Sequence, residues 1–177
     1  MTKFSTLSPV PGFRAWLANE LKRPESKLLT EPEVEQLKGP LSKLLSGHGD
    51  SNNVPSQLAS LIRANGCWSQ DPDLVALLET PLMRAASRYL FLEKRRNYAL
   101  NSVANFHLRN GATLWRINWL GDVSPRGMDN SCGIMVNYRY FLDQVDKNSN
   151  QYLVDHEIAA GEQVLQLASQ AKQLLTS

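Results

Sequence analysis

The sequence predicts a mixed α/β fold of the α+β kind, rich in helix and with few strands. Apolar residues recur at helical spacing through most of the first hundred residues. The stretch from Thr113 to Leu120 alternates as a strand does, and a short strand-like run from Phe4 to Leu7 opens the chain. The length of 177 residues suits one ordinary domain, which buries about 70% of its unfolded surface.

The first predicted elements are a strand and an amphipathic helix. The strand, Phe4 to Leu7, stops at Ser8-Pro9, because proline lacks the amide donor that a ladder needs. A strand that begins a chain requires neighbouring strands to pair with it. From Gly12 to Lys22 the apolar residues fall on one helical stripe, and Pro24 ends that helix.

A second helix is expected to begin at Thr30. Glu33 stands three residues later, which is the spacing of a capping box. Gly39-Pro40 is expected to break or kink this helix, because proline removes a backbone donor. Residues 46–53 are polar and glycine-rich, and therefore predict a loop.

Three further helices are expected in the first half of the chain. They cover residues 54–64, residues 72–79 with Asp71 as the cap, and residues 82–96, a helix opened by Thr80-Pro81. Most of the first hundred residues are therefore predicted to be helical.

The second half begins with a stretch rich in aromatic residues, asparagine and glycine. Its strand, Thr113 to Leu120, is expected to present an apolar, aromatic face made by Trp115, Ile117 and Trp119. Residues 132–145 and 149–175 are predicted to form two closing helices.

Composition and charge exclude several classes of protein. The chain has 19 Lys and Arg against 17 Asp and Glu, a net charge of +2, which is too small for nucleic-acid binding through bulk charge. Cys67 and Cys132 lie far apart with no CxxC motif, so neither a disulfide framework nor a thiolate metal site is expected. Neither a membrane-length apolar run nor a signal-peptide pattern occurs, which predicts a cytosolic or organellar protein in a reducing compartment.

Two residues are candidates for chemistry. His107 is followed closely by Gly111, which is expected to adopt a left-handed turn at the end of a short helix. Ser8 ends a strand just before a helix, where α/β sheets place reactive groups, although no GxSxG motif surrounds it. His48 and His156 are expected to be exposed, and no HExxH or similar metal-ligand spacing is present. The residues alone favour structural roles for Ser8 and His107.

Basic residues are concentrated between Arg84 and Arg126, where eight Lys or Arg stand against two acidic residues. A phosphate-bearing ligand is the functional interpretation of this excess. For Arg84 and Arg88, one helical turn apart, a solvated helix face is the favoured interpretation. Trp115 and Trp119 could stack on a nucleobase, but core packing is the commoner role of such residues.

Three motifs give the chain a family resemblance. They are FSTLSPVPGFRAWL from Phe4, TPLMRAASRYL from Thr80, and NYALNSVANFHLRNGATLWRINWLGDVSPRGMDNSCGIMVNYRYFLD from Asn97. Together they closely resemble the C-terminal part of malonyl-CoA decarboxylases. The resemblance implies the helix-rich C-terminal portion of a GNAT-like acyltransferase fold. It also implies that residues 1–177 form the C-terminal part of the catalytic domain, without the upstream strands, the phosphate loop and the N-terminal helical domain of the family.

The resemblance also implies a reaction and a site. The reaction is the decarboxylation of malonyl-CoA to acetyl-CoA and carbon dioxide, without a metal or an organic cofactor. By its motifs the family's catalytic serine corresponds to Ser8, as proton acceptor, and its catalytic histidine to His107, as proton donor. Both residues are expected to contact the substrate, and His107 is expected to act near its ordinary pKa of ~6.5. Ser8 as a covalent nucleophile is an alternative, and Arg109, Asn105 and Tyr140 are possible supporting residues.

Partners and location follow from the same resemblance. Malonyl-CoA is the expected partner, with no nucleic acid and no membrane span, and self-association is expected to depend on the upstream regions. A cytoplasmic or mitochondrial-matrix location is expected, because the end of the chain, Leu175-Thr176-Ser177, is not a peroxisomal signal. The alternative function is that of a truncated, non-catalytic binding or interaction module.

Overall fold

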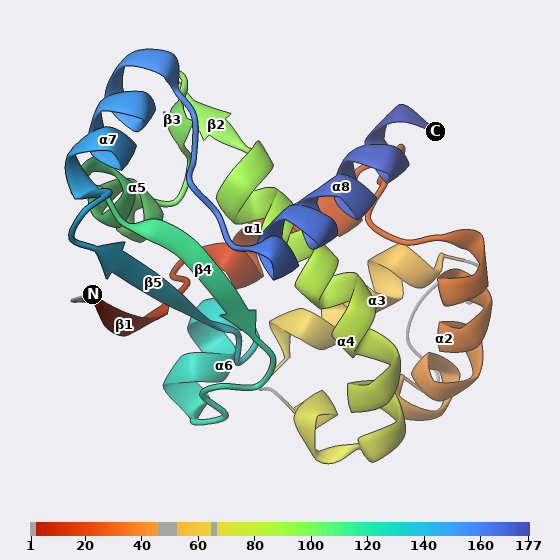
Figure 1. Cartoon of the computed structure of the whole chain (residues 1–177). Coiled ribbons are helices and arrows are strands. Elements are labelled where there is room, and N and C mark those ends of the chain that lie inside the picture. Colours follow the sequence, from red (N-terminus) through yellow and green to blue (C-terminus); the bar gives the residue numbers. More distant parts are fainter. Residues whose placement is uncertain (1–2, 46–52, 65–66) are drawn as a thin grey trace.

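A three-stranded antiparallel sheet lies at one side of a group of helices in the computed structural model, which describes residues 3–45, 53–64 and 67–177 (Figure 1). The strands lie in the order β1, β5, β4. The first half of the chain contains β1 (Lys3–Pro9), α1 (Phe13–Leu21), α2 (Glu31–Leu44), α3 (Val54–Arg63), the 3-10 turn η1 (Cys67–Gln70), α4 (Pro72–Ser87), the π-helical turn η2 (Arg88–Leu92), β2 (Lys94–Arg95) and β3 (Tyr98–Ala99). The second half contains α5 (Ser102–Arg109), β4 (Thr113–Asn118), α6 (Pro125–Ser131), β5 (Met135–Phe141), α7 (Val145–Asn150), the π-helical turn η3 (Gln151–Asp155) and α8 (Glu162–Thr176).

The predicted helices of the first half are largely confirmed, and so are their caps. Thr30 and Glu33 form the expected capping box, and Asp71 caps α4 through the amides of Asp73 and Leu74. The predicted loop at 46–53 lies outside the described residues except for Asn53, which caps α3.

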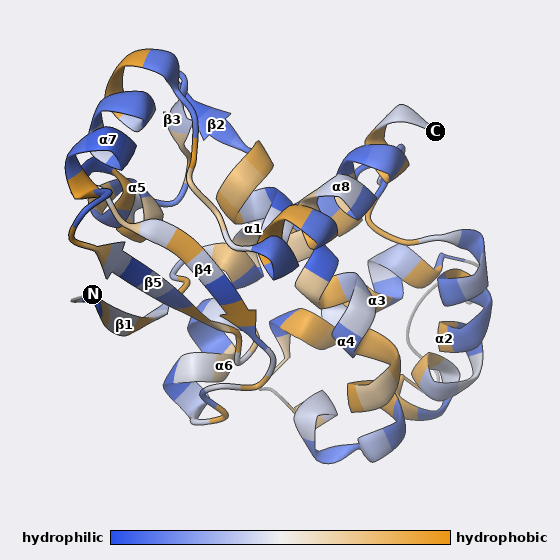
Figure 2. Cartoon of the chain, in the orientation of Figure 1, coloured by the Kyte–Doolittle hydropathy of each residue, from blue (hydrophilic) through white to orange (hydrophobic). Residues whose placement is uncertain are grey.

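Pro40, expected to break or kink a helix, and Pro81, expected to open a new one, both lie inside continuous helices. α2 continues through Pro40, and α4 runs through Pro81, so that the two helices predicted at 72–79 and 82–96 form one helix followed by η2. Tertiary packing outweighs the lost backbone hydrogen bond, because α4 buries Leu78 and Leu82 on either side of Pro81. Hydrophobic residues are prominent along α4, whereas α7 is mostly hydrophilic (Figure 2).

The largest error of the sequence prediction is the helix expected at 132–145, where the structure has the central strand β5. Val136, Tyr138 and Tyr140 are buried, and the residues between them are partly exposed, which is the two-residue period of a strand. β-branched and aromatic residues favour this conformation. The left-handed Gly133, with φ of +79°, precedes the strand.

The strand predicted at 113–120 is confirmed as β4, but its expected apolar, aromatic face is wrong. A β-bulge at Trp115 shifts the register, so that Leu114 and Ile117, three positions apart, are both fully buried. Trp115 is therefore only half-buried, with the guanidinium of Arg139 4.3 Å from its ring centre.

The single closing helix expected at 149–175 is divided. His156 adopts a left-handed conformation with φ of +59° after η3, and α8 begins only at Glu162. Between them the chain is extended and pairs in parallel with β4 at Leu114 and Ala160. The sheet is therefore supported beside β4, whereas β1 has β5 as its only partner among the described residues.

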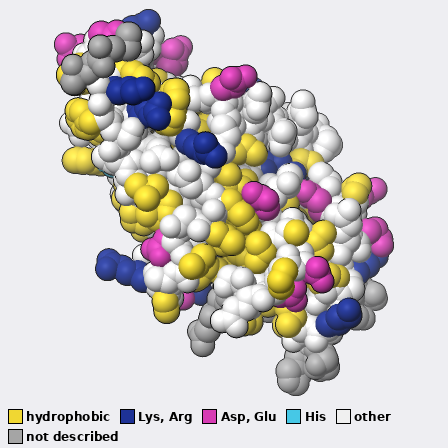
Figure 3. All heavy atoms as spheres, turned by 60° about the horizontal axis from the view of Figure 1, so that its bottom comes forward, with side chains coloured by type: hydrophobic (Ala, Val, Ile, Leu, Met, Phe, Trp, Pro, Cys, Tyr) yellow, Lys and Arg dark blue, Asp and Glu magenta, His cyan; other side chains and the backbone are white. Residues whose placement is uncertain are grey.

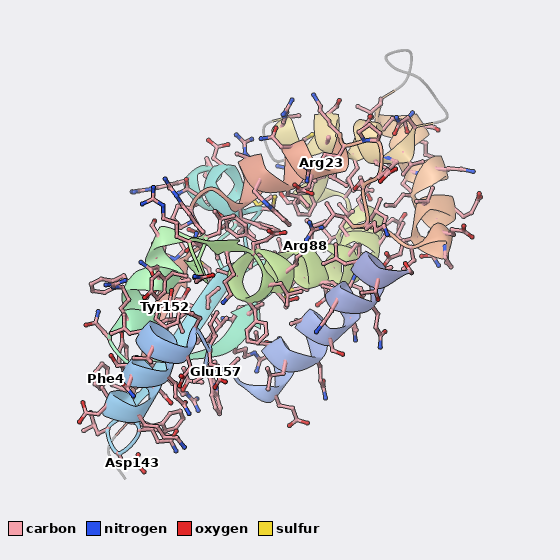
Figure 4. The ribbon with its side chains drawn as sticks, turned by 90° about the horizontal axis from the view of Figure 1, so that it is seen from above. Phe4, Arg23, Arg88, Asp143, Tyr152 and Glu157 are labelled. Carbon is pink, nitrogen blue, oxygen red and sulfur yellow. The ribbon has the colours of Figure 1, made fainter. Side chains whose placement is uncertain are left out.

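Arg84 and Arg88 do not form the solvated helix face expected of them. Arg84 is buried and donates to the Glu33 carboxylate at 2.6 and 3.2 Å and to the Leu28 carbonyl at 2.8 Å. Arg88 pairs with Glu20 at 3.4 Å and lies among the helices, far from Phe4 at the strand end of the molecule (Figure 4). Both arginines join helices together.

The side chains of Arg84 and Arg88 therefore do not provide a phosphate site near the sheet. For Glu33, burial alone would raise the pKa, but hydrogen bonds from Arg84 and Thr30 hold the pKa of its carboxyl below the usual value.

Elsewhere on the surface, hydrophobic side chains gather at the centre of one face and charged ones lie mainly around them (Figure 3).

Candidate active site

Ser8 and His107, 99 positions apart in the chain, meet in the structure. Ser8 Oγ lies 3.3 Å from His107 Nε2, and both residues are less than a tenth exposed. Ser8 stands near the end of β1, opposite Val136 of β5, and His107 stands in the last turn of α5. The fold therefore brings together the two residues that the family resemblance selected.

A tyrosine holds the other side of the imidazole. Tyr140 of β5 places its hydroxyl 2.7 Å from His107 Nδ1, so both ring nitrogens of the histidine have a hydrogen-bond partner. Tyr138, two residues earlier on the same face of β5, stacks on the imidazole with ring centres 4.2 Å apart and planes 17° from parallel. The histidine ring is thereby fixed in position and in tilt.

Backbone contacts at both ends of α5 hold His107 in place. Asn101 caps the helix by accepting from the Ala104 amide, and its side-chain amide donates to the Pro11 carbonyl at 2.9 Å. That contact ties the start of α5 to the turn that follows Ser8. At the other end, Gly111 adopts the predicted left-handed conformation, with φ of +87°.

Gly111 cannot carry a larger side chain without disturbing this arrangement. A Cβ atom there would lie 2.2 Å from the Val145 carbonyl oxygen, which is far inside van der Waals contact. The next amide, of Ala112, donates to the carbonyl of His107 at 3.1 Å. Glycine at this position thus allows the chain to turn out of α5 a few residues after His107.

Burial changes the acid–base behaviour of the site. It lowers the pKa of the His107 imidazole below its ordinary value, because the charged form loses hydration. The pKa of His107 is therefore lower than the ordinary value expected from the sequence. Burial raises the pKa of Tyr140, so its hydroxyl remains protonated around neutral pH.

The other residues considered from the sequence have different positions. Asn105 accepts a hydrogen bond from Tyr152, and the guanidinium of Arg109 lies 5.5 Å from the ring centre of Tyr98, so these side chains support α5 rather than the Ser8–His107 pair. His156 is exposed, as predicted. His48 lies outside the described residues.

Three features of the site were missed from the sequence. They are the stacking of Tyr138, the cap at Asn101 and the contact of Thr6 Oγ1 with Ser8 Oγ at 3.4 Å. The stacking of Tyr138 could have been anticipated from the alternation of polar and aromatic residues at 135–141, because this alternation predicts a strand with its tyrosines on one face. Within the described ranges, no three His, Cys, Asp or Glu side chains gather as a cluster able to hold a metal ion.

Comparison with protein families identifies the chain. A family model for the malonyl-CoA decarboxylase C-terminal domain matches residues 1–176. The chain belongs to the malonyl-CoA decarboxylase family. Two curated relatives, the mitochondrial malonyl-CoA decarboxylases of Anser anser anser and Mus musculus, are 45% and 42% identical to it over 96% and 94% of its length. In each case the match covers 33% of the relative, so the chain spans about a third of their length.

Solved structures of malonyl-CoA decarboxylases support the fold. The enzyme from Rhodopseudomonas palustris matches 93% of this chain with a TM-score of 0.71 and 35% identity, and the match covers 33% of that enzyme's chain. The enzyme from Agrobacterium vitis matches 94% with a TM-score of 0.67 and 32% identity, over 36% of its own chain. The mixed, helix-rich α/β class is confirmed, and the closer likeness to acyltransferases stays a prediction.

Proposed function

We propose that this chain carries the reaction site of a malonyl-CoA decarboxylase, which converts malonyl-CoA to acetyl-CoA and carbon dioxide. The observation that supports it most strongly is the 3.3 Å contact between Ser8 and His107 in a chain of this family. A buried serine and histidine in contact suit proton transfer better than they suit a non-catalytic interaction module.

The chemistry requires a proton donor beside the reacting carbon. When the carboxylate of the malonyl thioester leaves as carbon dioxide, the electron pair of the broken carbon–carbon bond forms an enolate of the acetyl thioester. In the proposed mechanism His107 gives its proton to the enolate carbon, which forms the methyl group, and then recovers a proton from solvent. Ser8 accepts a hydrogen bond from His107 Nε2, while its own hydroxyl donates a hydrogen bond to the malonyl group.

Tyr140 determines which nitrogen of His107 carries the proton. Because its hydroxyl remains protonated, it can donate to Nδ1, which leaves the hydrogen of the neutral imidazole on Nε2, facing Ser8. The anionic malonyl carboxylate then raises the pKa of the nearby histidine, because an opposite charge favours imidazolium. In the imidazolium Nδ1 also carries a hydrogen, and the Tyr140 hydroxyl turns to accept from it. Substrate binding thus counters the effect of burial and charges the proton donor only when it is needed.

The cellular setting follows from the proposed reaction and from the relatives. Malonyl-CoA brings its coenzyme A as part of the substrate, so the chemistry requires no separate cofactor. The proposed reaction belongs to malonyl-CoA and fatty-acid metabolism, and the names of both curated relatives favour a mitochondrial location. Within the described part of the chain, no helix is both long and apolar enough to cross a bilayer.

Matched substitutions test this function. In a complete enzyme that contains this chain, Ser8→Ala and His107→Asn are each expected to lower turnover of malonyl-CoA by ~10²–10³, the usual loss when one polar group is removed from such a site. Ser5→Ala, also on β1 but on the opposite face, and His156→Asn, at an exposed histidine, serve as controls with wild-type turnover expected. Near-wild-type activity of either site variant would remove the role assigned to that residue.

A further inference from the structure

A second hydroxyl lies beside Ser8. Thr6 stands two residues earlier on β1, and its side chain therefore points to the same face of the strand. Thr6 Oγ1 is 3.4 Å from Ser8 Oγ, and Thr6 is half-buried. Its cross-strand partner is Tyr138, the residue whose ring stacks on His107. Thr6 thus belongs to the same surface as the Ser8–His107 pair.

Four side chains form a continuous line of hydrogen-bonding groups. The line runs from Tyr140 to His107 at 2.7 Å, from His107 to Ser8 at 3.3 Å and from Ser8 to Thr6 at 3.4 Å. With Tyr140 donating to Nδ1, the hydrogen on Nε2 points to Ser8 Oγ and the Ser8 hydroxyl points to Thr6 Oγ1. His107 and Ser8 then each use one donor and one acceptor, Tyr140 donates and Thr6 accepts, and the hydroxyl hydrogen of Thr6 is directed away from the line.

We propose that the Thr6 hydroxyl binds the carboxylate of the substrate together with Ser8 and so selects thioesters that carry a β-carboxylate. This proposal rests on the proposed function and adds a residue to it. A carboxylate has two oxygens, and adjacent hydroxyls on one strand can each donate to one of them. Such bonds to an ionised acceptor are stronger than neutral ones.

The arrangement distinguishes substrate from product. Malonyl-CoA has the carboxylate and acetyl-CoA lacks it, so the two hydroxyls favour the molecule before decarboxylation over the one after it. Once carbon dioxide has left, Thr6 and Ser8 bond each other again and the product loses this attachment. A site built to donate hydrogen bonds to a carboxylate discriminates against ligands without one, because its polar groups are then less well paired.

Thr6→Val and Thr6→Ser provide the test. Valine keeps the β-branched shape that suits the strand and removes the hydroxyl, whereas serine keeps the hydroxyl. Binding of malonyl-CoA and of acetyl-CoA is measured by calorimetry in a complete enzyme that contains this chain, for both variants, for the wild type and for the control Ser5→Ala. Steady-state kcat and KM are measured in parallel.

Thr6→Val is expected to bind malonyl-CoA about tenfold more weakly, with acetyl-CoA binding unchanged, since one charge-assisted hydrogen bond is lost. Thr6→Ser is expected to return malonyl-CoA binding to within about twofold of wild type, and Ser5→Ala to match wild type. Unchanged malonyl-CoA binding in Thr6→Val, or an equal loss for both ligands, would overturn the role of Thr6 alone. A complete wild-type enzyme that binds no malonyl-CoA would instead overturn the proposed function, and the role of Thr6 with it.

Discussion

Removing the hydroxyl of Tyr140 tests one interaction of the site, because a single oxygen atom is deleted and the packing of the aromatic ring is kept. Tyr140→Phe deletes the 2.7 Å partner of His107 Nδ1. The aromatic ring remains, and with it the stacking on Phe4, whose ring centre lies 4.8 Å away with planes 14° apart. Any change in activity can therefore be attributed to the hydrogen bond.

The expected size of the fall in kcat follows from the loss of that one hydrogen bond. A neutral hydrogen bond contributes about 1 kcal/mol net, and about 1.4 kcal/mol corresponds to a tenfold change in rate. We therefore expect kcat for malonyl-CoA to fall by about 5- to 10-fold, because the imidazole no longer has a fixed orientation and tautomer. KM is expected to change little, since Tyr140 orients His107 and does not contact the carboxylate. The same loss should lower Tm by roughly 2–4 °C.

The assay combines kinetics with nitrogen-15 NMR of the histidine. In the wild type, Nδ1 of neutral His107 should appear unprotonated and Nε2 protonated, whereas Tyr140→Phe should show a mixture of the two tautomers. Tyr98→Phe is the matched control, because it deletes a tyrosine hydroxyl that donates to the Leu153 carbonyl, away from the pair. If Tyr140→Phe left both kcat and the tautomer of His107 unchanged, the assigned role of Tyr140 would be refuted.

Two further predictions concern pH and association. Burial lowers the pKa of His107, and imidazolium is the proposed donor, so kcat/KM should fall as pH rises through a value below ~6.5. The fall in kcat should come at higher pH, because the bound substrate carboxylate raises the pKa of His107. Identical midpoints for kcat and kcat/KM in rate-versus-pH profiles would contradict this prediction. The outer edge of β1 has no strand partner among the described residues, and Leu7 is 57% exposed. The chain should therefore self-associate in sedimentation experiments, and Leu7→Lys should reduce this self-association. A wild-type chain that stays monomeric at all concentrations would contradict the prediction.

Local signals in the sequence predicted the parts of the fold that depend on neighbouring residues. The capping box at Thr30 and Glu33, the cap at Asp71 and the left-handed turn at Gly111 are each determined within a few residues, and all three are confirmed. The pairing of Ser8 with His107 came from family motifs, because contacts between residues 99 positions apart leave no local pattern.

Non-local packing explains the errors. The alternation of residues 135–141 fits a strand, but their place at the centre of the sheet depends on β1 and β4 on either side. The bulge at Trp115 cannot be read from alternation, since an added residue reverses which side chains face inward. The burial of Arg84 depends on Glu33, which lies on another helix.

The most direct test of the account is the analysis of the products formed from malonyl-CoA in deuterated water by a complete malonyl-CoA decarboxylase that contains this chain. We expect equal amounts of acetyl-CoA and carbon dioxide, with one solvent deuterium in each acetyl methyl group, since His107 delivers a solvent-derived proton to the enolate carbon. His107→Asn should form both products at least ~10²-fold more slowly. Failure of the wild type to form acetyl-CoA, or equal rates in the wild type and His107→Asn, would contradict the central claim.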